Sequence, residues 1–335
     1  MTEAAGSLAR GDERGAGAPA VSVVVPAYNV ARYIAGALDS VFAQTFEDYE
    51  VIVINDGSPD TPELEHALEP YRGRLIYLRQ ENGGVSAARN AGIRAARGEF
   101  VAHLDPDDLW EPEYLAAQLE ALGRDPAVDV LYPNALIFGD APEAGREFMD
   151  WCPSEGEVTV EALLRQRCHV MCSVTARREA LVRAGLFDEG LRCSEDFDLW
   201  LRVLKGGGRI AYQRRVLVRY RRHAASHTAD FVWLNTSLLR VLDKAERTLE
   251  LTPGEREALE GMRRHARATL ELNEGKRAFF RGDARVAVAS LSAANAYFKS
   301  RRIACVVLLM RLSPKLLRRA YDARDRFVWR ADTKF

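Results

Sequence analysis

The feature of this sequence that most constrains its fold is a regular alternation of apolar runs with helical patterns, beginning at Val21. The apolar runs are short and rich in Val and Ile, and they cover residues 21–25, 51–54, 75–78 and 100–104. A helical pattern follows each run, at residues 31–43, 61–71, 85–97 and 112–123. Apolar strands separated by helices are typical of a parallel sheet that is covered on both faces. The sequence therefore predicts an α/β protein with a doubly wound, mostly parallel sheet.

The polar residues that follow each predicted strand are candidate site residues, because such sheets bind ligands beyond the carboxyl ends of their strands. They form the motifs Pro-Ala-Tyr-Asn at 26–29, Asn-Asp-Gly-Ser at 55–58, Glu-Asn-Gly-Gly at 81–84 and Asp-Pro-Asp-Asp at 105–108. The sequence has no Gly-x-Gly-x-x-Gly turn after its first strand and no Gly-Lys-Ser/Thr loop. A phosphate-bearing ligand would therefore need another counter-charge.

The motifs at 105–108, 55–58 and 26–29 each have a functional and a structural interpretation. Three carboxylates at 105–108 repel one another unless a cation is present, and hard oxygen ligands suit Mg²⁺ or Mn²⁺; the motif is alternatively an acidic turn before a helix. Asp56 is able to accept a hydrogen bond from a nucleotide base, and Tyr28 to offer that base an aromatic face. The alternative for Asp56 is an ordinary Asp-Gly turn, and the alternative for Tyr28 is a position at the edge of the core.

Three further sites remain open in the same way. Arg89 is a charged residue in a helix of small residues that favours close packing on the sheet, and a salt bridge is the alternative to a role in binding. Glu195 and Asp196 begin an apolar helix, where a carboxylate either serves as a general base or interacts with the helix dipole. His223 follows a basic run and is either a surface residue or a nitrogen ligand of a metal; the arginines of that run are alternatively ligands of a diphosphate.

In this order and at these spacings, the motifs resemble those of family 2 glycosyltransferases of the GT-A fold. The segments that carry the resemblance are 26–29, 55–58, 83–92, 105–108, 195–200 and 220–223. The resemblance covers residues 20–228 and implies inverting transfer of a sugar from a nucleotide diphosphate sugar, usually a UDP-sugar. One position departs from the family, because many members have Asp where this chain has Asn55.

The resemblance also implies roles for individual residues. Asp196 would be the general base, with Glu195 as the second choice. The nucleotide-sugar would be bound by Pro26, Tyr28, Asp56, Gly84, Arg89 and Asp105. Mn²⁺ or Mg²⁺ would be held by Asp107, Asp105 and His223. Such an ion would stabilise the negative charge that develops on a departing nucleoside diphosphate.

The chain is expected to divide into a disordered leader at 1–19, a GT-A catalytic domain for nucleotide-sugar and acceptor at 20–228, and a helical C-terminal region at 229–335. The formal net charge of −1 conceals an asymmetry. Residues 299–335 contain eleven basic and three acidic residues, a net charge of +8, which leaves −9 for residues 1–298. The two parts are therefore expected to meet partners of different charge.

The basic end has the pattern of an amphipathic helix. Its apolar stripe consists of Ile303, Val306, Val307 and Met310. With the surrounding basic residues, this pattern predicts contact of residues 303–330 with an anionic membrane surface; the alternative is that the stripe packs on other helices of the tail. Nucleic acid is not an expected partner, because the basic residues lie beside aliphatic rather than aromatic side chains.

An odd number of cysteines, five, and the absence of a signal-peptide pattern indicate a cytoplasmic protein. The basic amphipathic end adds the expectation that it is peripheral at the inner face of the cell membrane. We therefore expect an inverting, metal-dependent glycosyltransferase that acts on a hydroxyl of a glycan or lipid-linked acceptor in cell-surface polysaccharide synthesis. A protein of another class also fits the motifs: a catalytically silent nucleotide-sugar-binding module whose helical tail recruits partners. The presence of both Asp107 and Asp196 favours the enzyme, because a silent module needs no base.

Overall fold

The structure is a computed structural model that describes residues 17–171, 173–223, 230–314 and 317–318. The chain divides into two units. The first comprises Met1–Phe138 and Gly145–Arg221, and the second comprises Gly139–Ala144 and Arg222–Phe335. The predicted leader at 1–19 lies outside the described residues as far as residue 16.

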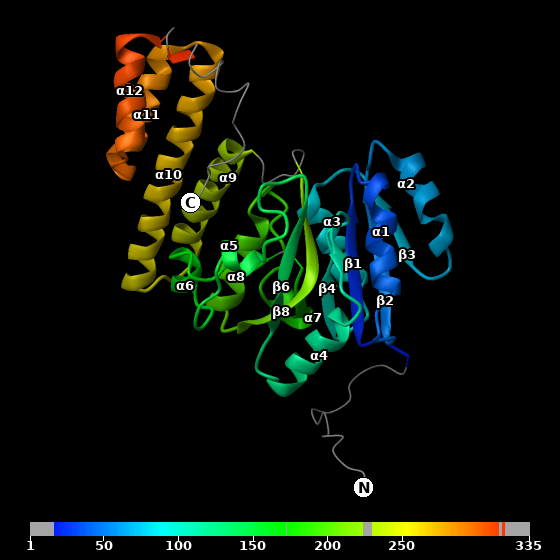
Figure 1. Cartoon of the computed structure of the whole chain (residues 1–335). Coiled ribbons are helices and arrows are strands. Elements are labelled where there is room, and N and C mark those ends of the chain that lie inside the picture. Colours follow the sequence, from blue (N-terminus) through cyan, green and yellow to red (C-terminus); the bar gives the residue numbers. More distant parts are fainter. Residues whose placement is uncertain (1–16, 172, 224–229, 315–316, 319–335) are drawn as a thin grey trace. The chain divides into compact units, whose positions relative to one another are not determined.

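The first unit is built on an eight-stranded sheet with the strand order β3-β2-β1-β4-β7-β6-β8-β5. The Val- and Ile-rich runs form its parallel half, in which β1 pairs with both β2 and β4, and β2 pairs with β3. These strands are β1 (Val21–Ala27), β2 (Tyr49–Asp56), β3 (Ile76–Gln80) and β4 (Phe100–His103). The connecting helices are α1 (Ala31–Phe42), α2 (Thr61–Leu68) with the 3-10 turn η1 (Glu69–Tyr71), α3 (Val85–Ala95) and α4 (Tyr114–Arg124) (Figure 1).

The other half of the sheet is antiparallel. β7 (Thr175–Arg177) pairs with β4 and with β6 (Val130–Gly139), and β5 (Leu109–Trp110) pairs with β8 (Ile210–Arg222). The helices of this part are α5 (Phe148–Trp151), α6 (Val160–Leu164), α7 (Arg178–Arg183) and α8 (Glu195–Lys205). The predicted α/β class is confirmed, and the mostly parallel sheet proves to be a mixed one.

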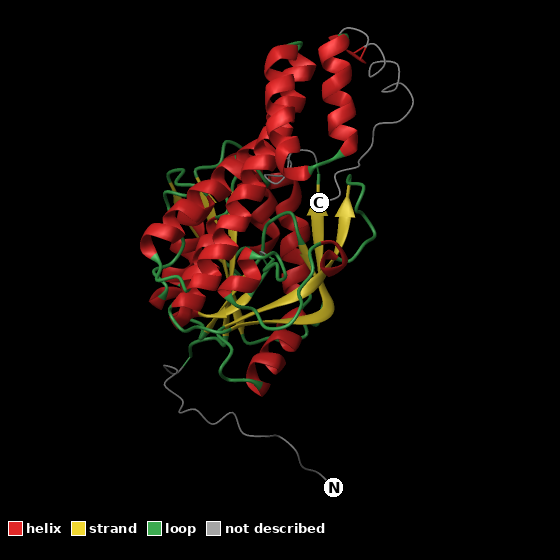
Figure 2. Cartoon of the chain, turned by 90° about the vertical axis from the view of Figure 1, so that its left-hand side faces the viewer, coloured by secondary structure: helices red, strands yellow, loops and turns green. Residues whose placement is uncertain are grey.

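Small residues allow α3 to lie directly on the parallel strands, as the sequence predicts. A side chain added at Gly92 would come within 2.4 Å of Val24 and 2.9 Å of Ile54. All seven residues of β1 are buried, which is expected of a strand covered on both faces. Figure 2 shows the strands with helices packed around them.

The second unit contains the long helices of the C-terminal region (Figure 1). These are α9 (Phe231–Thr248), α10 (Pro253–Arg281), α11 (Ala284–Phe298) and α12 (Arg301–Leu312). α10 begins at a capping box formed by Thr252 and Glu255, and Gly282 in the left-handed conformation ends it. None of the helices that the structure describes combines the length and hydropathy needed to cross a bilayer.

The apolar stripe of α12 corrects one prediction. Val307 and Met310 are buried in a cluster with residues of α10 and α11, and Ile303 and Val306 pack against the same cluster. The stripe therefore attaches α12 to its neighbouring helices and is not the face that meets a membrane. Of the remaining predicted membrane segment, residues 315–316 and 319–330 lie outside the described residues.

Candidate active site

Asp56, at the end of β2, anchors the loops that follow β2 and β3. Its side chain is buried, and its residue is 2% exposed. One carboxylate oxygen accepts hydrogen bonds from the Gln80 amide at 2.7 Å and from the Gly83 N–H at 2.9 Å, while the other accepts one from the Gly84 N–H at 2.7 Å. Gly84 has φ +86°, which favours glycine. Asp56 thus fixes the shape of this loop, and its contact with a base stays a prediction.

Tyr28 and Pro26 lie in and before the neighbouring loop. Tyr28 is 50% exposed, so its ring is accessible for stacking. The next residue, Asn29, donates its N–H to the Ser58 hydroxyl at 2.6 Å, which ties this loop to the one after β2. Pro26 is a buried residue of β1. The pairing of β1 with β4 ends at Val24, two residues before Pro26. Its missing N–H therefore costs no ladder hydrogen bond to β4.

Asn55, the position that departs from the family pattern, organises its loop. Its side-chain oxygen accepts a hydrogen bond from the Ser58 N–H at 2.8 Å, and its amide donates to the hydroxyls of Thr61 and Tyr77 at 3.0 and 2.7 Å. An aspartate could accept the first bond but could not donate the other two, because an ionised carboxylate has no donor and a protonated one has a single O–H. The substitution is therefore matched by its local partners.

The acidic turn after β4 holds three carboxylates close together. Asp108 is buried, and burial together with the charges of Asp107 and Asp105 raises its pKa well above the usual range. One oxygen of Asp108 accepts the Arg221 N–H at 2.7 Å, whereas the other is buried and has no hydrogen-bond partner among the described residues. The Arg221 guanidinium donates to the Asp107 carbonyl at 2.8 Å. Arg221 therefore supports the turn.

Arg89 connects this turn to the beginning of α8. Its residue is 4% exposed, and its two terminal nitrogens lie 2.8 Å from an Asp105 oxygen and 2.7 Å from a Glu195 oxygen. The guanidinium also lies over the ring of Phe187, 5.3 Å from its centroid. The ion pair that the sequence left open as an alternative is thus present, and it has two partners rather than one. A direct contact of Arg89 with nucleotide stays a prediction.

The start of α8 gathers acidic side chains in a low-dielectric setting. Ser194 precedes the helix with φ +58°, a conformation that is uncommon for residues other than glycine. Glu195 is buried, and Asp196 is partly buried beside it. Burial and the charge of Glu195 raise the pKa of Asp196 to about 6. Because Glu195 is paired with Arg89, Asp196 is the better suited of the two to accept a proton near neutral pH.

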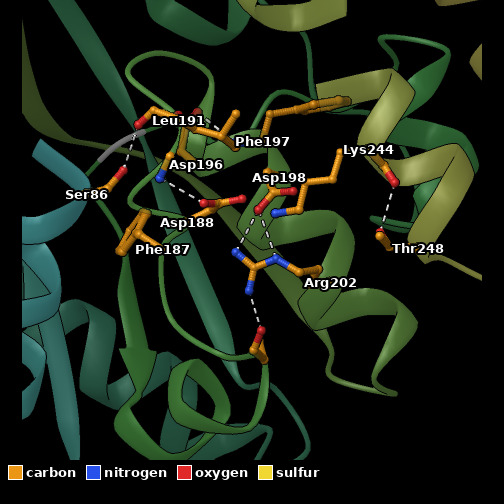
Figure 3. A network of polar contacts seen from close by, with 12 residues as sticks. Ser86, Phe187, Asp188, Leu191, Asp196, Phe197, Asp198, Arg202, Lys244 and Thr248 are labelled. Atoms are coloured by element: carbon orange, nitrogen blue, oxygen red, sulfur yellow. Dashed lines mark hydrogen bonds and ion pairs between the residues drawn. The ribbon is translucent and has the colours of Figure 1, made fainter. Parts of the chain in front are cut away.

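Figure 3 shows contacts that hold α8 and the loop before it. The Ser86 hydroxyl, in the first turn of α3, donates to the Leu191 carbonyl at 3.1 Å. Within α8, Asp198 pairs with Arg202 at 2.7 Å. Asp196 lies between these two anchored segments in the sequence, and one of its oxygens accepts the Phe197 N–H at 2.7 Å. The candidate base therefore stands on a well-supported element.

The residues described do not form a metal site by themselves. Among residues 17–171, 173–223, 230–314 and 317–318, no three His, Cys, Asp or Glu side chains gather as ligands of a metal ion. Mg²⁺ typically binds one or two carboxylates together with the phosphates of a substrate, so Asp107 and Asp105 fit a site that the donor completes. One buried oxygen of Asp108 in this turn has no hydrogen-bond partner among the described residues, as expected of a turn whose polar groups meet a further ligand. His223 belongs to the second unit, and its role stays a prediction.

Two residues of the site were not singled out from the sequence. Gln80 donates a hydrogen bond to Asp56, and the two residues are register partners on β2 and β3. Alignment of the two predicted strands could therefore have placed Gln80 beside Asp56. Arg192 lies against Gly84, where an added side chain would come within 2.2 Å of its guanidinium. Arg192 belongs to an irregular loop, and no periodic pattern could have indicated its position.

Residues 22–181 match the family model described as "Glycosyl transferase family 2". The chain is 31% identical over 214 residues to an uncharacterized glycosyltransferase of Rickettsia typhi, covering 63% of this chain and 66% of that protein. It is 31% identical over 210 residues to a Rickettsia felis glycosyltransferase, covering 62% of this chain and 35% of that protein. It is also 43% identical over 106 residues to the putative glycosyltransferase EpsH of Bacillus subtilis, or 31% of each protein. The chain thus spans only part of the length of these relatives.

Solved structures share the fold. TarS 1–349 of S. aureus in complex with UDP-GlcNAc superposes with a TM-score of 0.57 at 19% identity, over 93% of both chains. The mannosyltransferase PcManGT from Pyrobaculum calidifontis, in complex with GDP-Man and Mn²⁺, gives a TM-score of 0.55 at 22% identity. That match covers 88% of this chain and 79% of the other. At this level of identity the likeness establishes a common GT-A fold.

Proposed function

We propose that this chain, whose residues 22–181 belong to glycosyl transferase family 2, transfers a sugar from a nucleotide diphosphate sugar to a hydroxyl of an acceptor, with inversion at the anomeric carbon. A UDP-sugar is the expected donor. Complexes of proteins with the same fold with UDP-GlcNAc and with GDP-Man support a nucleotide-sugar as the donor class. The acceptor is a glycan or a lipid-linked glycan of cell-surface polysaccharide synthesis.

The single observation that carries the proposal is the ion-pair chain Asp105–Arg89–Glu195. Its two contacts are 2.8 and 2.7 Å long, and its central guanidinium is buried. The chain joins the acidic turn, on the side expected for the donor, to the helix that begins with the candidate base. Residues that are separated by 106 positions in the sequence are thereby fixed next to one another. A direct displacement needs the donor-binding groups and the base to be held close together, and this ion-pair chain supports such an arrangement.

The chemistry follows from these positions. The Asp196 carboxylate accepts the proton of the acceptor hydroxyl as its oxygen forms a bond to the anomeric carbon of the sugar. The bond from that carbon to the diphosphate oxygen breaks, and its electron pair leaves with the nucleoside diphosphate. A single displacement of this kind inverts the anomeric centre and needs no carboxylate nucleophile. The raised pKa of Asp196 makes it a stronger base than an ordinary aspartate.

The proposed reaction would use Mn²⁺ or Mg²⁺, which Asp107 and Asp105 would hold together with the donor diphosphate. The ion would neutralise the negative charge of the leaving group. His223 would be an additional ligand. The protein's own contribution to this site is the acidic turn, which Arg89 contacts at the Asp105 carboxylate and Arg221 at the Asp107 carbonyl. The Mn²⁺ in the complex of PcManGT supports a metal in a protein of this fold.

The proposed place of action is the cytoplasm at the inner face of the cell membrane, where a lipid-linked acceptor would be accessible. The supporting observation is the net charge of +8 over residues 299–335, since a positive segment is attracted to anionic lipids. The enzyme would therefore bind its donor from solution and its acceptor at the membrane surface.

The proposal is tested by incubating the full chain with UDP-, GDP- and dTDP-sugars in the presence of Mn²⁺ and measuring nucleotide release. We expect release from one donor class, its loss on addition of EDTA, and its recovery with excess Mn²⁺. With a sugar acceptor, proton NMR of the product should show the anomeric configuration opposite to that of the donor. Donor binding without release, in the presence of candidate acceptors, would favour the nucleotide-sugar-binding module instead.

A further inference from the structure

Helix α12 has a second apolar face, opposite the one that attaches it to α11. Its inner side chains, Val307 and Met310, are buried in the cluster shared with α10 and α11. The outer side chains Leu308, Leu309 and Leu312 are exposed by 57%, 49% and 73%. They are spaced i, i+1 and i+4, so they lie on one side of the helix. Three of the eight large hydrophobic residues that are exposed in the described part of the chain are thus gathered within five positions.

This leucine face is surrounded by positive charge. Arg301, Arg302 and Arg311 are exposed on the same helix, and α12 contains no Asp or Glu. The guanidinium of Arg311 donates to the Ser292 hydroxyl at 3.5 Å. α12 lies beside the other helices of its unit (Figure 1). Because its inner face packs on α10 and α11, the leucines and arginines are presented together on a preformed surface.

A preformed helix with apolar side chains flanked by basic ones has the chemistry of a segment that lies in the interface of an anionic membrane. Two other occupants fit less well. An isologous contact between two copies of this face would bring the arginines of both copies together without an acidic residue of α12 to compensate them. Nucleic acid would leave three leucines without the base stacking that aromatic side chains provide.

We propose that Leu308, Leu309 and Leu312 insert into the headgroup region of an anionic membrane while Arg301, Arg302 and Arg311 bind the lipid phosphates. The inference rests on the proposed function, because it supplies the surface on which a lipid-linked acceptor is reached. The membrane-binding face proposed here is therefore the leucine face of α12, opposite the stripe of Ile303, Val306, Val307 and Met310 that the sequence pattern indicates.

The test is co-sedimentation of the full chain with vesicles of phosphatidylcholine alone and of phosphatidylcholine mixed with phosphatidylglycerol. We expect binding to the mixed vesicles only. Replacing Leu308, Leu309 and Leu312 with Gln together should lower the binding constant at least tenfold, and Arg301→Gln with Arg302→Gln about thirtyfold. Val182→Gln, at an exposed apolar residue of α7, is the matched control and should bind as the unaltered chain does.

Thermal unfolding of each variant checks that α12 is still folded, and nucleotide release in the absence of vesicles separates this inference from the proposed function. The leucine variant should release nucleotide at an unaltered rate. Equal binding to both vesicle types, absence of binding, or unaltered binding by the leucine variant would overturn the inference. A dimer that only the leucine variant loses, without vesicle binding, would assign the face to a second copy. Vesicle binding without any nucleotide release would leave this surface standing and remove the proposed function.

Discussion

At the residue scale, the site depends on Arg89, whose importance the sequence could not reveal. The sequence identifies it as a charged residue within a run of small ones, but its partners lie 16 and 106 positions away. Glu195 and Asp196 were predictable as carboxylates at a helix start, because that position has a local signal. The distinction between them arises only in the folded chain, where Glu195 is neutralised by Arg89 and Asp196 is left with a raised pKa.

Arg89 should act as a positioning residue. Lysine keeps the charge but lacks the planar fork that places one nitrogen on each carboxylate, so Arg89→Lys cannot reproduce the geometry of the bridge. We expect kcat to fall by about tenfold or more, equivalent to about 1.4 kcal/mol, with a smaller change in the KM for the donor. Non-additivity with Glu195→Gln in a double-mutant cycle would identify the bridge as the cause. Arg94→Lys, at an exposed arginine on the same helix, is the control, and an unaltered kcat for Arg89→Lys would contradict this role.

The raised pKa of Asp196 predicts a conflict between stability and activity. Its folded pKa of about 6 lies above the usual value of 3.8, so this group stabilises the fold below about pH 4 and loses that effect as pH rises through 6. Asp196→Asn should therefore increase the free energy of unfolding at pH 7.5, on the order of 1–3 kcal/mol, and much less at pH 4. Denaturant titration at both pH values measures this difference.

Asp198→Asn is the matched control for that measurement, because Asp198 lies in the same turn and is paired with Arg202. Its replacement should lower the stability at pH 7.5. If Asp196→Asn were also destabilising at pH 7.5, the carboxylate would be stabilised by its surroundings, and its assignment as a base with a raised pKa would be wrong.

At the element scale, the strands of the parallel half of the sheet were predictable, whereas β6 and β7 of the antiparallel half were not. Strands buried on both faces read as Val and Ile runs, which is why β1 and β2 are found from the sequence alone. β6 contains Pro133 and Asn134 in its centre, residues that are depleted in strands, and β7 is only three residues long. The strand conformation of β6 and β7 depends on pairing with neighbouring strands, so the local sequence pattern does not predict it.

The packing of α10 on α11 gives a prediction at this scale. Gly275 and Gly261 both lie within α10, but a side chain added at Gly275 would come within 2.7 Å of Leu291, whereas nothing lies within 4 Å at Gly261. Gly261→Ala should stabilise the chain by about 0.5–1 kcal/mol through helix propensity. Gly275→Ala should destabilise it by about 1–3 kcal/mol, because the helices would have to separate. Equal effects of the two substitutions on the melting temperature would contradict this packing.

At the scale of the whole molecule, the negatively and positively charged parts of the sequence correspond to two different proposed roles. Residues 1–298, with a net charge of −9, contain the carboxylates that the proposed reaction uses, and residues 299–335, with +8, contain the basic face of α12. The sequence located both regions. It left two interpretations of the apolar stripe of α12 open, because an amphipathic pattern does not tell whether a stripe meets a membrane or another helix; the structure shows that it packs on other helices.

The central claim is that Asp196 is the base of a nucleotide-sugar transfer, and the most direct test measures donor binding and turnover in one variant. We predict that Asp196→Asn binds the donor within about threefold of the unaltered chain, as measured by calorimetry, while its kcat falls by about 10²–10⁴-fold. Asp125→Asn, at an exposed carboxylate at the end of α4, should change neither value. Turnover by Asp196→Asn at the rate of the unaltered chain would contradict the account, as would a loss of turnover explained entirely by a loss of donor binding.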